Sequence, residues 1–150
     1  RDSYEDVLIG RVRHLADDAE IERRYGAINA FEKGLVDRGI RIVKVMLHIS
    51  SDEQKARLAE RLDRPDKYWK YNPADVDERA LWPQYMDAYQ TVFDRTSTPD
   101  APWFVVPADR KWYARLAVQA LLLDALEDID PQWPAAHFDV ALEKRRLAAT

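Results

Sequence analysis

The sequence predicts an α/β fold that is mostly helical and contains two short buried strands. Segments of helical periodicity alternate with apolar runs in the order helix–strand–helix–helix–strand–helix. The two runs are IRIVKVMLHI at 40–49 and WFVVP at 103–107. Their density of β-branched and apolar residues is typical of strands buried on both faces, as in a parallel sheet. Because two strands make a small sheet, we expect further strands to precede residue 1.

Length and composition exclude several classes of protein. The 150 residues correspond to one ordinary domain, and 47% of them are hydrophobic. The absence of cysteine excludes disulfide scaffolds, thiolate zinc sites and cysteine nucleophiles, and it fits a reducing compartment, so we expect a cytoplasmic protein. A net charge of −4 argues against general binding of nucleic acid or of an anionic membrane, and no apolar run is long enough to span a membrane.

Two segments precede the first predicted strand. Residues 4–14 are predicted to form a helix or a mixture of strand and helix, and residues of about 19–38 a helix, with Gly39 where that helix should stop. That helix carries apolar side chains at helical spacing: Ile21, Tyr25, Ile28, Phe31 and Leu35. Ser50 or Ser51 can cap the helix that follows the first strand.

The second half is predicted to hold three more helices. A helix at about 76–95 precedes the second strand, and Asp109 can cap a helix at about 110–127 that follows it. The apolar residues expected to face inward from the latter are Trp112, Leu116, Leu123 and Leu126. Residues 134–150 are predicted to form a C-terminal helical tail.

A polar helix at about 51–63 and a proline-punctuated connection at 64–75 stand out from the rest. Only Leu58 and Leu62 form an apolar stripe on this helix, so it buries little area. Elements that bury so little area open easily, and active-site lids are drawn from such elements.

A row of cations lies on this polar helix and its connection. Arg57, Arg61 and Arg64 share one helix face, and Lys67 and Lys70 extend the row. Guanidinium groups match phosphate oxygens in a bidentate manner, while lysine acts as a movable point charge. The row therefore indicates a phosphate-binding surface.

The alternative interpretation of the row is an ordinary solvated helix. Acidic residues stand four positions before two of the arginines, which allows the pairs Glu53–Arg57 and Glu60–Arg64. Because the segment is nearly balanced in sign, composition by itself favours this alternative.

Two further patterns have both a functional and an ordinary interpretation. Aromatic residues gather in the middle of the chain and could stack on a base, although rings at helical spacing are usually core: Tyr68, Trp69, Tyr71, Trp82, Tyr85 and Tyr89. Arg110, Lys111 and Arg115 follow Asp109 at a strand-to-helix switch, the usual anion-binding corner of an open α/β sheet. The ordinary interpretation of this corner is a helix cap with solvated charges.

Three segments, taken in order, resemble the second polyphosphate kinase family. They are YEDVL, then FEKGLVDRGIRIVKVMLHISSDEQKARLAERLDRPDKYWKYNPADVDER, then FDRTSTPDAPWFVVPADRKWYARL. The resemblance covers about residues 1–133, and its combination of motifs is highly specific. It implies the C-terminal part of a P-loop kinase-like three-layer fold, with residues of about 51–75 as a helical lid. The glycine-rich loop and magnesium-holding aspartate of the family are expected to lie N-terminal to such a segment.

The resemblance also implies an activity. Members of the family move phosphoryl groups between inorganic polyphosphate and nucleotides, with Mg²⁺. We therefore expect a polyphosphate-dependent phosphotransferase that acts on the adenine nucleotides AMP and ADP and forms a homo-oligomer. Because the sequence contains no GxxxxGK[ST] loop, we expect the chain by itself to be inactive, with its magnesium ligands mostly outside it.

Site residues are carried over from the family position by position. The expected catalytic residues are Arg1, Arg57 and Arg61. The residues expected to bind the phosphate chain are Arg64, Lys67, Lys70, Arg110 and Lys111. Tyr4 and Glu5 are expected to set nucleotide selectivity, since YED resembles the branch that accepts nucleoside monophosphates as well as diphosphates. Asp2 departs from the serine usual in the family.

A second function class remains open at this point. The same surface could belong to a non-catalytic module that binds phosphate chains, or only another protein.

Overall fold

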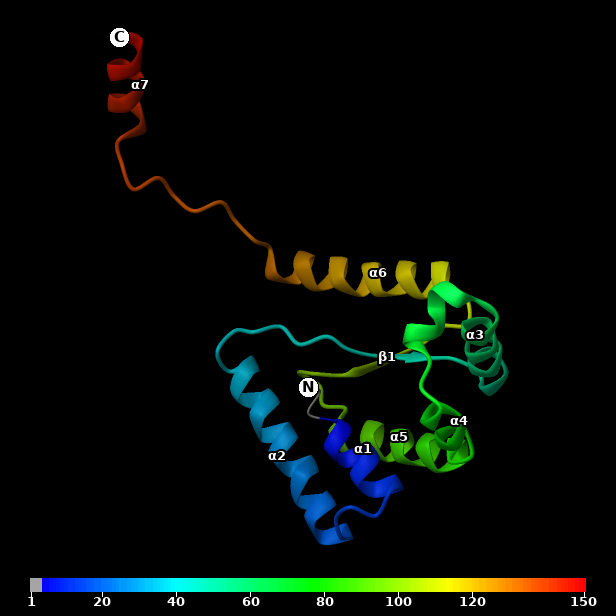
Figure 1. The fold of residues 1–150 in the computed structure, drawn as a ribbon. Coiled ribbons are helices and arrows are strands. Elements are labelled where there is room, and N and C mark those ends of the chain that lie inside the picture. The colour runs from blue at the N-terminus through cyan, green and yellow to red at the C-terminus, as the bar shows by residue number, and fades with distance from the viewer. Residues whose placement is uncertain (1–3) are drawn as a thin grey trace.

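The computed structural model describes residues 4–150 and contains a two-stranded parallel sheet with helices on both of its faces (Figure 1). The elements, in order, are α1 (Glu5–Val12), α2 (Asp18–Val36), β1 (Lys44–His48), α3 (Ser51–Asp63), the 3₁₀ helix η1 (Pro65–Lys70), α4 (Ala74–Arg79), α5 (Trp82–Thr96), β2 (Trp103–Pro107), α6 (Lys111–Ile129) and α7 (Val140–Ala148). Figure 1 shows α1, α2 and α5 on one face of the sheet and α6 on the other. The prediction of a mostly helical fold with two short strands is confirmed in this coarse form.

One predicted helix proved to be two. The segment expected as a helix at about 76–95 is divided into α4 and α5, with Ala80 and Leu81 between them. Pro83 lies in the first turn of α5. Proline lacks an N–H and clashes with the preceding turn, so it is tolerated in a first helical turn but not in an interior. A continuous helix across this position was therefore a wrong prediction.

The strands are less buried than the sequence indicates. Leu47 of β1 is 55% exposed and Val105 of β2 is 51% exposed, whereas Val106 is buried. A sheet of two strands has an edge on each strand, and the flanking helices cover only part of each face. The expectation of strands buried on both faces is thus not met in the described chain.

The main hydrophobic core lies where α1, α2 and α5 pack together. Its buried members are Tyr4, Val7, Leu8, Ile21, Tyr25, Ile28, Ala88 and Val92. A Cβ on Gly10 would approach the Ile21 side chain to 3.2 Å, so the small residue lets α1 lie close to α2. Phe31, expected in the buried stripe, is 60% exposed, and its neighbour Glu32 is buried instead.

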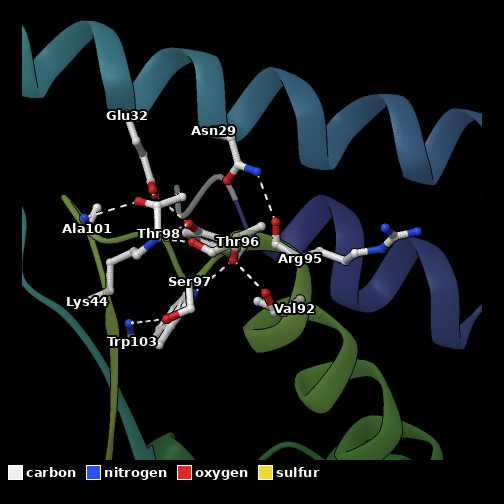
Figure 2. A network of polar contacts seen from close by, with 11 residues as sticks. Asn29, Glu32, Lys44, Val92, Arg95, Thr96, Ser97, Thr98, Ala101 and Trp103 are labelled. Carbon is white, nitrogen blue, oxygen red and sulfur yellow. Dashed lines mark hydrogen bonds and ion pairs between the residues drawn. The ribbon is translucent and has the colours of Figure 1, made fainter.

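Glu32 is buried because it belongs to a polar network at the start of the sheet (Figure 2). Lys44 Nζ lies 2.7 Å from Glu32 Oε2 and donates to the Thr96 carbonyl oxygen at 2.6 Å. The Tyr4 hydroxyl donates to Glu32, and Trp103 Nε1 donates to Thr96 Oγ1 at 2.9 Å. These bonds join α1, α2, α5 and both strands.

Helix α6 faces the sheet with small side chains. Ala114 and Ala125 are its buried residues, whereas the four residues expected to face inward are more than half exposed: Trp112, Leu116, Leu123 and Leu126. Apolar residues occur all around this helix, so periodicity could not identify the face that meets the sheet. The inward orientation was a wrong prediction.

The C-terminal tail extends away from the rest of the molecule (Figure 1). It forms α7 as predicted, although the helix begins only at Val140, where the Asp139 carboxylate accepts a hydrogen bond from the Leu142 N–H at 3.0 Å. Neither α7 nor any other helix within residues 4–150 combines the length and the apolar character that crossing a bilayer requires.

Candidate functional site

The carboxyl ends of β1 and β2 lie at the same edge of the sheet because the strands are parallel. Beyond β1, Ser50 Oγ accepts a hydrogen bond from the Glu53 N–H at 3.1 Å and caps α3, which confirms one of the two predicted caps. Beyond β2, Asp109 Oδ1 accepts a hydrogen bond from the Ser50 N–H at 2.7 Å. This bond ties together the two loops at the carboxyl edge.

Asp109 does not cap the helix that follows it. Helix α6 begins at Lys111, its N-cap is Arg110, and none of the described side chains caps it. The predicted cap was therefore wrong, because the Asp109 carboxylate is engaged across the sheet edge with Ser50.

The hydrogen bond from Ser50 holds the pKa of the Asp109 carboxyl below its usual range. The stability that this bond contributes is therefore present above the ordinary carboxyl pKa and is lost as the pH falls through the lowered pKa. We predict that an NMR titration of Asp109 gives a depressed pKa and that the Ser50 amide resonance follows the same transition. In Asp109→Asn the Ser50 resonance should show no such transition; a transition that persists in this variant contradicts the assignment.

Arg57 fastens α3 to the loop after β2. Its Nε donates to Glu53 Oε1 at 2.7 Å, and its Nη2 donates to the carbonyl oxygens of Ala108 at 2.8 Å and of Asp109 at 3.3 Å. The Glu53–Arg57 pair expected of a solvated helix is thus present, but the side chain is only about a quarter exposed. The Arg57 side chain is therefore held at the carboxyl edge by both α3 and the loop after β2.

A cavity of about 540 Å³ opens beside Arg57. It is lined by Leu47, Ile49, Arg57, Ala108, Lys111, Ala114, Arg115, Val118 and Gln119. The described residues around it include three cations and no acid. Lys111 and Arg115 stand four positions apart on α6, a spacing at which like charges repel unless an anion lies between them. An anionic group in this cavity would meet positive charge from both α3 and α6.

Arg57, predicted to be catalytic, and Lys111, predicted to bind the phosphate chain, therefore share one cavity, whereas a further predicted binding residue lines another. Arg110 borders a separate hollow of about 370 Å³ with Ser50 and Asp109. Arg115 completes the cationic cavity, and the sequence had placed it at the anion-binding corner with Arg110 and Lys111, although it was not among the site residues carried over from the family.

The remaining cations of the row point to partners within the polar helix and its connection. Arg61 Nη1 lies 3.3 Å from Asp75 Oδ2 and donates to the Lys70 carbonyl oxygen. Arg64 Nη2 lies 2.7 Å from Asp66 Oδ2, and Arg64 Nη1 lies 3.4 Å from Glu60 Oε1. The Glu60–Arg64 pair expected of a solvated helix is therefore also present.

The two lysines of the row also have partners within this segment. Lys67 pairs with Glu60, and the Lys70 ammonium lies 4.7 Å from the centre of the Trp69 ring. Neither these lysines nor Arg61 and Arg64 line the cationic cavity. Their role in phosphate binding stays a prediction.

The predicted site residues at the start of the chain differ in where they lie. Arg1 lies outside the described residues. Tyr4 is only 7% exposed, and its hydroxyl bonds within the buried network, so its side chain lies in the core. Glu5 begins α1 and is half-buried. Their part in nucleotide selectivity stays a prediction.

A metal site is not formed by residues 4–150: no three carboxylate or imidazole groups in this range lie together as ligands. A role for magnesium stays an expectation from the family resemblance.

Comparison with known proteins identifies the family. The model of Polyphosphate kinase 2 (PPK2) matches residues 1–134. The chain belongs to the polyphosphate kinase 2 family. A crystal structure of polyphosphate kinase 2 from Arthrobacter aurescens TC1 is 59% identical in sequence and superimposes with a TM-score of 0.96, covering 100% of this chain and 53% of that one.

Two curated relatives in the family have named activities. The AMP/ADP-polyphosphate phosphotransferase of Meiothermus ruber is 45% identical over 134 residues, which are 89% of this chain and 50% of that protein. The ADP-polyphosphate phosphotransferase of Rhodopseudomonas palustris is 40% identical over 146 residues, again with 89% and 50% coverage. The chain thus spans about half the length of these polyphosphate kinase 2 relatives.

Proposed function

We propose that this chain takes part in phosphoryl transfer between inorganic polyphosphate and the adenine nucleotides AMP and ADP. The observation that carries the proposal is the cationic cavity at the carboxyl edge of the sheet, where Arg57, Lys111 and Arg115 meet. Open α/β sheets bind ligands at this edge. The names of the relatives support the substrates, and the parallel strands between helical layers support a P-loop kinase-like fold.

These residues would neutralise the charge of the phosphate oxygens and align the substrates. Phosphoryl transfer leaves little covalent work for a protein, so catalysis rests on positioning and on electrostatic stabilisation of phosphate oxygens. Arg57 is suited to this work because its guanidinium is already held by Glu53 and by two backbone carbonyls. A donor fixed in advance loses little conformational freedom when the anion arrives.

Residues 51–75 are the proposed lid. The cations of its polar helix and of η1 would also bind the phosphate chain when the lid contacts it. Arg61, Arg64 and Lys67 are held by exposed carboxylates. Exposed ion pairs of this kind contribute little to stability, so polyphosphate can replace the carboxylates at small cost. The lid has few apolar contacts, since Leu58 is the buried residue of α3 and Leu62 is 51% exposed, although Arg57 fastens its first helix to the loop after β2.

Finer expectations follow from the family. We propose that Glu5 favours AMP as an acceptor and that Arg1 contributes to catalysis. Magnesium would be held by residues other than those described here. Because the sequence contains no GxxxxGK[ST] loop, we expect the 150 residues alone to bind substrates without turning them over.

Titration of tripolyphosphate into the chain at several salt concentrations tests the proposal. Binding should be measurable by calorimetry and should weaken steeply as salt rises, because the cations release counterions from a polyanion. The net charge of −4 makes general attraction a poor explanation of such binding. Absent or salt-independent binding would contradict the proposal and favour a module that contacts only other proteins.

A further inference from the structure

Arg79 joins the two ends of the lid. It is the last residue of α4, the helix in which the lid ends, and its guanidinium reaches back to the first turn of α3. Its Nη1 donates to the Ser51 carbonyl oxygen at 2.9 Å and to Gln54 Oε1 at 2.7 Å, and its Nη2 donates to Ser51 Oγ at 3.3 Å. Hydrogen bonds from an ionised donor are stronger than neutral ones, so residues 28 positions apart are held together here.

The end of α4 that carries Arg79 is itself anchored to the rest of the molecule. The neighbouring Glu78 accepts hydrogen bonds from Arg13, directly after α1, and from the Tyr85 hydroxyl of α5 at 2.8 Å. Helices α1 and α5 both contribute to the main hydrophobic core. Arg79 therefore connects the start of α3 to a part of the chain that the core holds in place.

The lid depends on polar contacts for its position. None of the described residues 51–75 belongs to the main hydrophobic core or to the smaller cluster around Val106. The ion pairs of the lid cations described above join residues of the lid to one another, so they do not fix the lid relative to the sheet. Arg57 holds α3 to the loop after β2, and Arg79 holds the first turn of α3 to α4.

The acceptors of Arg79 differ in kind from those of the exposed lid cations. They are a backbone carbonyl, a hydroxyl and a side-chain amide oxygen, all neutral, and the Arg79 side chain is half-buried. Arg79 is not among the residues that line the cationic cavity. A phosphate chain that replaces the exposed carboxylates of the lid therefore leaves the bonds of Arg79 in place.

We propose that Arg79 is a positioning residue for the lid. Its bonds set the direction in which α3 leaves the edge of the sheet, and thereby hold Arg57, on the same helix, beside the cationic cavity. Small displacements of a group that binds a reacting phosphate cost much of its effect, so a fixed lid base serves catalysis. This inference rests on the proposed function, because Arg79 acts on the phosphate only through Arg57.

Pulsed electron spin resonance measures the lid position directly. The chain contains no cysteine, so Ala59→Cys on α3 and Asp87→Cys on α5 place spin labels at two exposed positions and nowhere else. The distance between the labels should have a narrow distribution in this background and a broad one once Arg79→Ala is added. A distribution that stays narrow overturns the inference.

Arg24→Ala is the matched control for both the distances and the affinity. Arg24 is also half-buried and also donates to a side-chain oxygen, of Glu20, and to a backbone carbonyl, of Asp6, but it joins α1 to α2. The variant removes the same charge as Arg79→Ala, and it should leave the label distances and tripolyphosphate binding unchanged.

Tripolyphosphate binding separates failure of this inference from failure of the proposed function. Arg79→Ala should weaken binding about 2–10-fold at unchanged helix content, because Arg57 must then be ordered when the anion arrives. Arg79→Lys keeps the charge but not the planar fork, so it should restore part of the affinity and part of the narrow distribution. A broad distribution with unchanged affinity overturns the positioning role. If the unaltered chain binds no tripolyphosphate, the proposed function fails, while the label distances still decide whether Arg79 orients the lid.

A variant that retains Arg79 covers the case in which Arg79→Ala does not fold. Ser51→Ala with Gln54→Ala removes the two side-chain acceptors and leaves the backbone carbonyl. Helix α3 keeps its cap in this variant, because the cap is Ser50. The label distances should again broaden, and a distribution as narrow as that of the unaltered background overturns the inference.

Discussion

Replacing Arg57 with alanine should weaken tripolyphosphate binding by roughly 10–150-fold, the loss expected for one hydrogen bond between charged groups of about 1.5–3 kcal/mol. Arg57 should have the largest effect among the cations of the row because it both lines the cationic cavity and is fixed in place. Isothermal titration calorimetry of the 150-residue chain measures this change directly. The salt dependence of binding should also become shallower, because one fewer cation neutralises the chain.

Two variants separate this role from a structural one. Arg57→Lys keeps the charge but loses the planar fork, so it should retain only part of the affinity. Arg38→Ala is the matched control, since Arg38 lies beyond α2 and donates to the Gly34 carbonyl oxygen of its own turn. Equal affinity in Arg57→Ala and the unaltered chain, at unchanged helix content, removes Arg57 from the phosphate site.

Replacing Glu32 with alanine should lower the free energy of unfolding by about 3–5 kcal/mol. The substitution leaves the Lys44 ammonium, whose side chain is 5% exposed, without its carboxylate partner. Domains of this size are stable by only about 5–15 kcal/mol, so the loss takes a large share of the total. Urea unfolding followed by tryptophan fluorescence measures the change.

A surface pair on the same helix provides the control. Glu22 of α2 pairs with Arg95 at 2.7 Å, and both side chains are about half exposed. Glu22→Ala should therefore cost only about 0–1 kcal/mol. The double variant Glu32→Leu with Lys44→Met should recover much of the lost stability, because no buried charge is left unpaired. A Glu32→Ala loss no larger than that of Glu22→Ala contradicts the network as a stability determinant.

Local features of the sequence predicted helices and strands well where the type of one residue determines the local structure. The polar helix was predicted at 51–63 and the second strand at 103–107, and both have these bounds in the structure. Gly39 has a φ of +80°, a left-handed conformation that glycine adopts without strain, after the end of α2. Ser50 caps α3 through a bond to a residue only three positions away.

The candidate site was predictable only in part. Lys111 was placed at a strand-to-helix switch and Arg57 on the helix after the first strand, and both line the cationic cavity. Arg61 and Arg64 share the sequence pattern of Arg57, yet the structure pairs them with carboxylates of the lid. A row of cations on one helix face does not indicate which of those cations lies beside the edge of the sheet.

The sequence by itself determined where most of the helices and the second strand form, which end of each strand carries the charged loops, and the family, because these depend on residues close to one another along the chain. The tertiary structure alone decided that Glu32 is buried beside Lys44, that Asp109 bonds to Ser50 rather than capping α6, and that Arg115 completes a cavity with Arg57. Each of these joins residues far apart in sequence or selects one face of a helix. Burial and partner choice depend on which surfaces pack together, and short-range patterns of residue type carry no information about that.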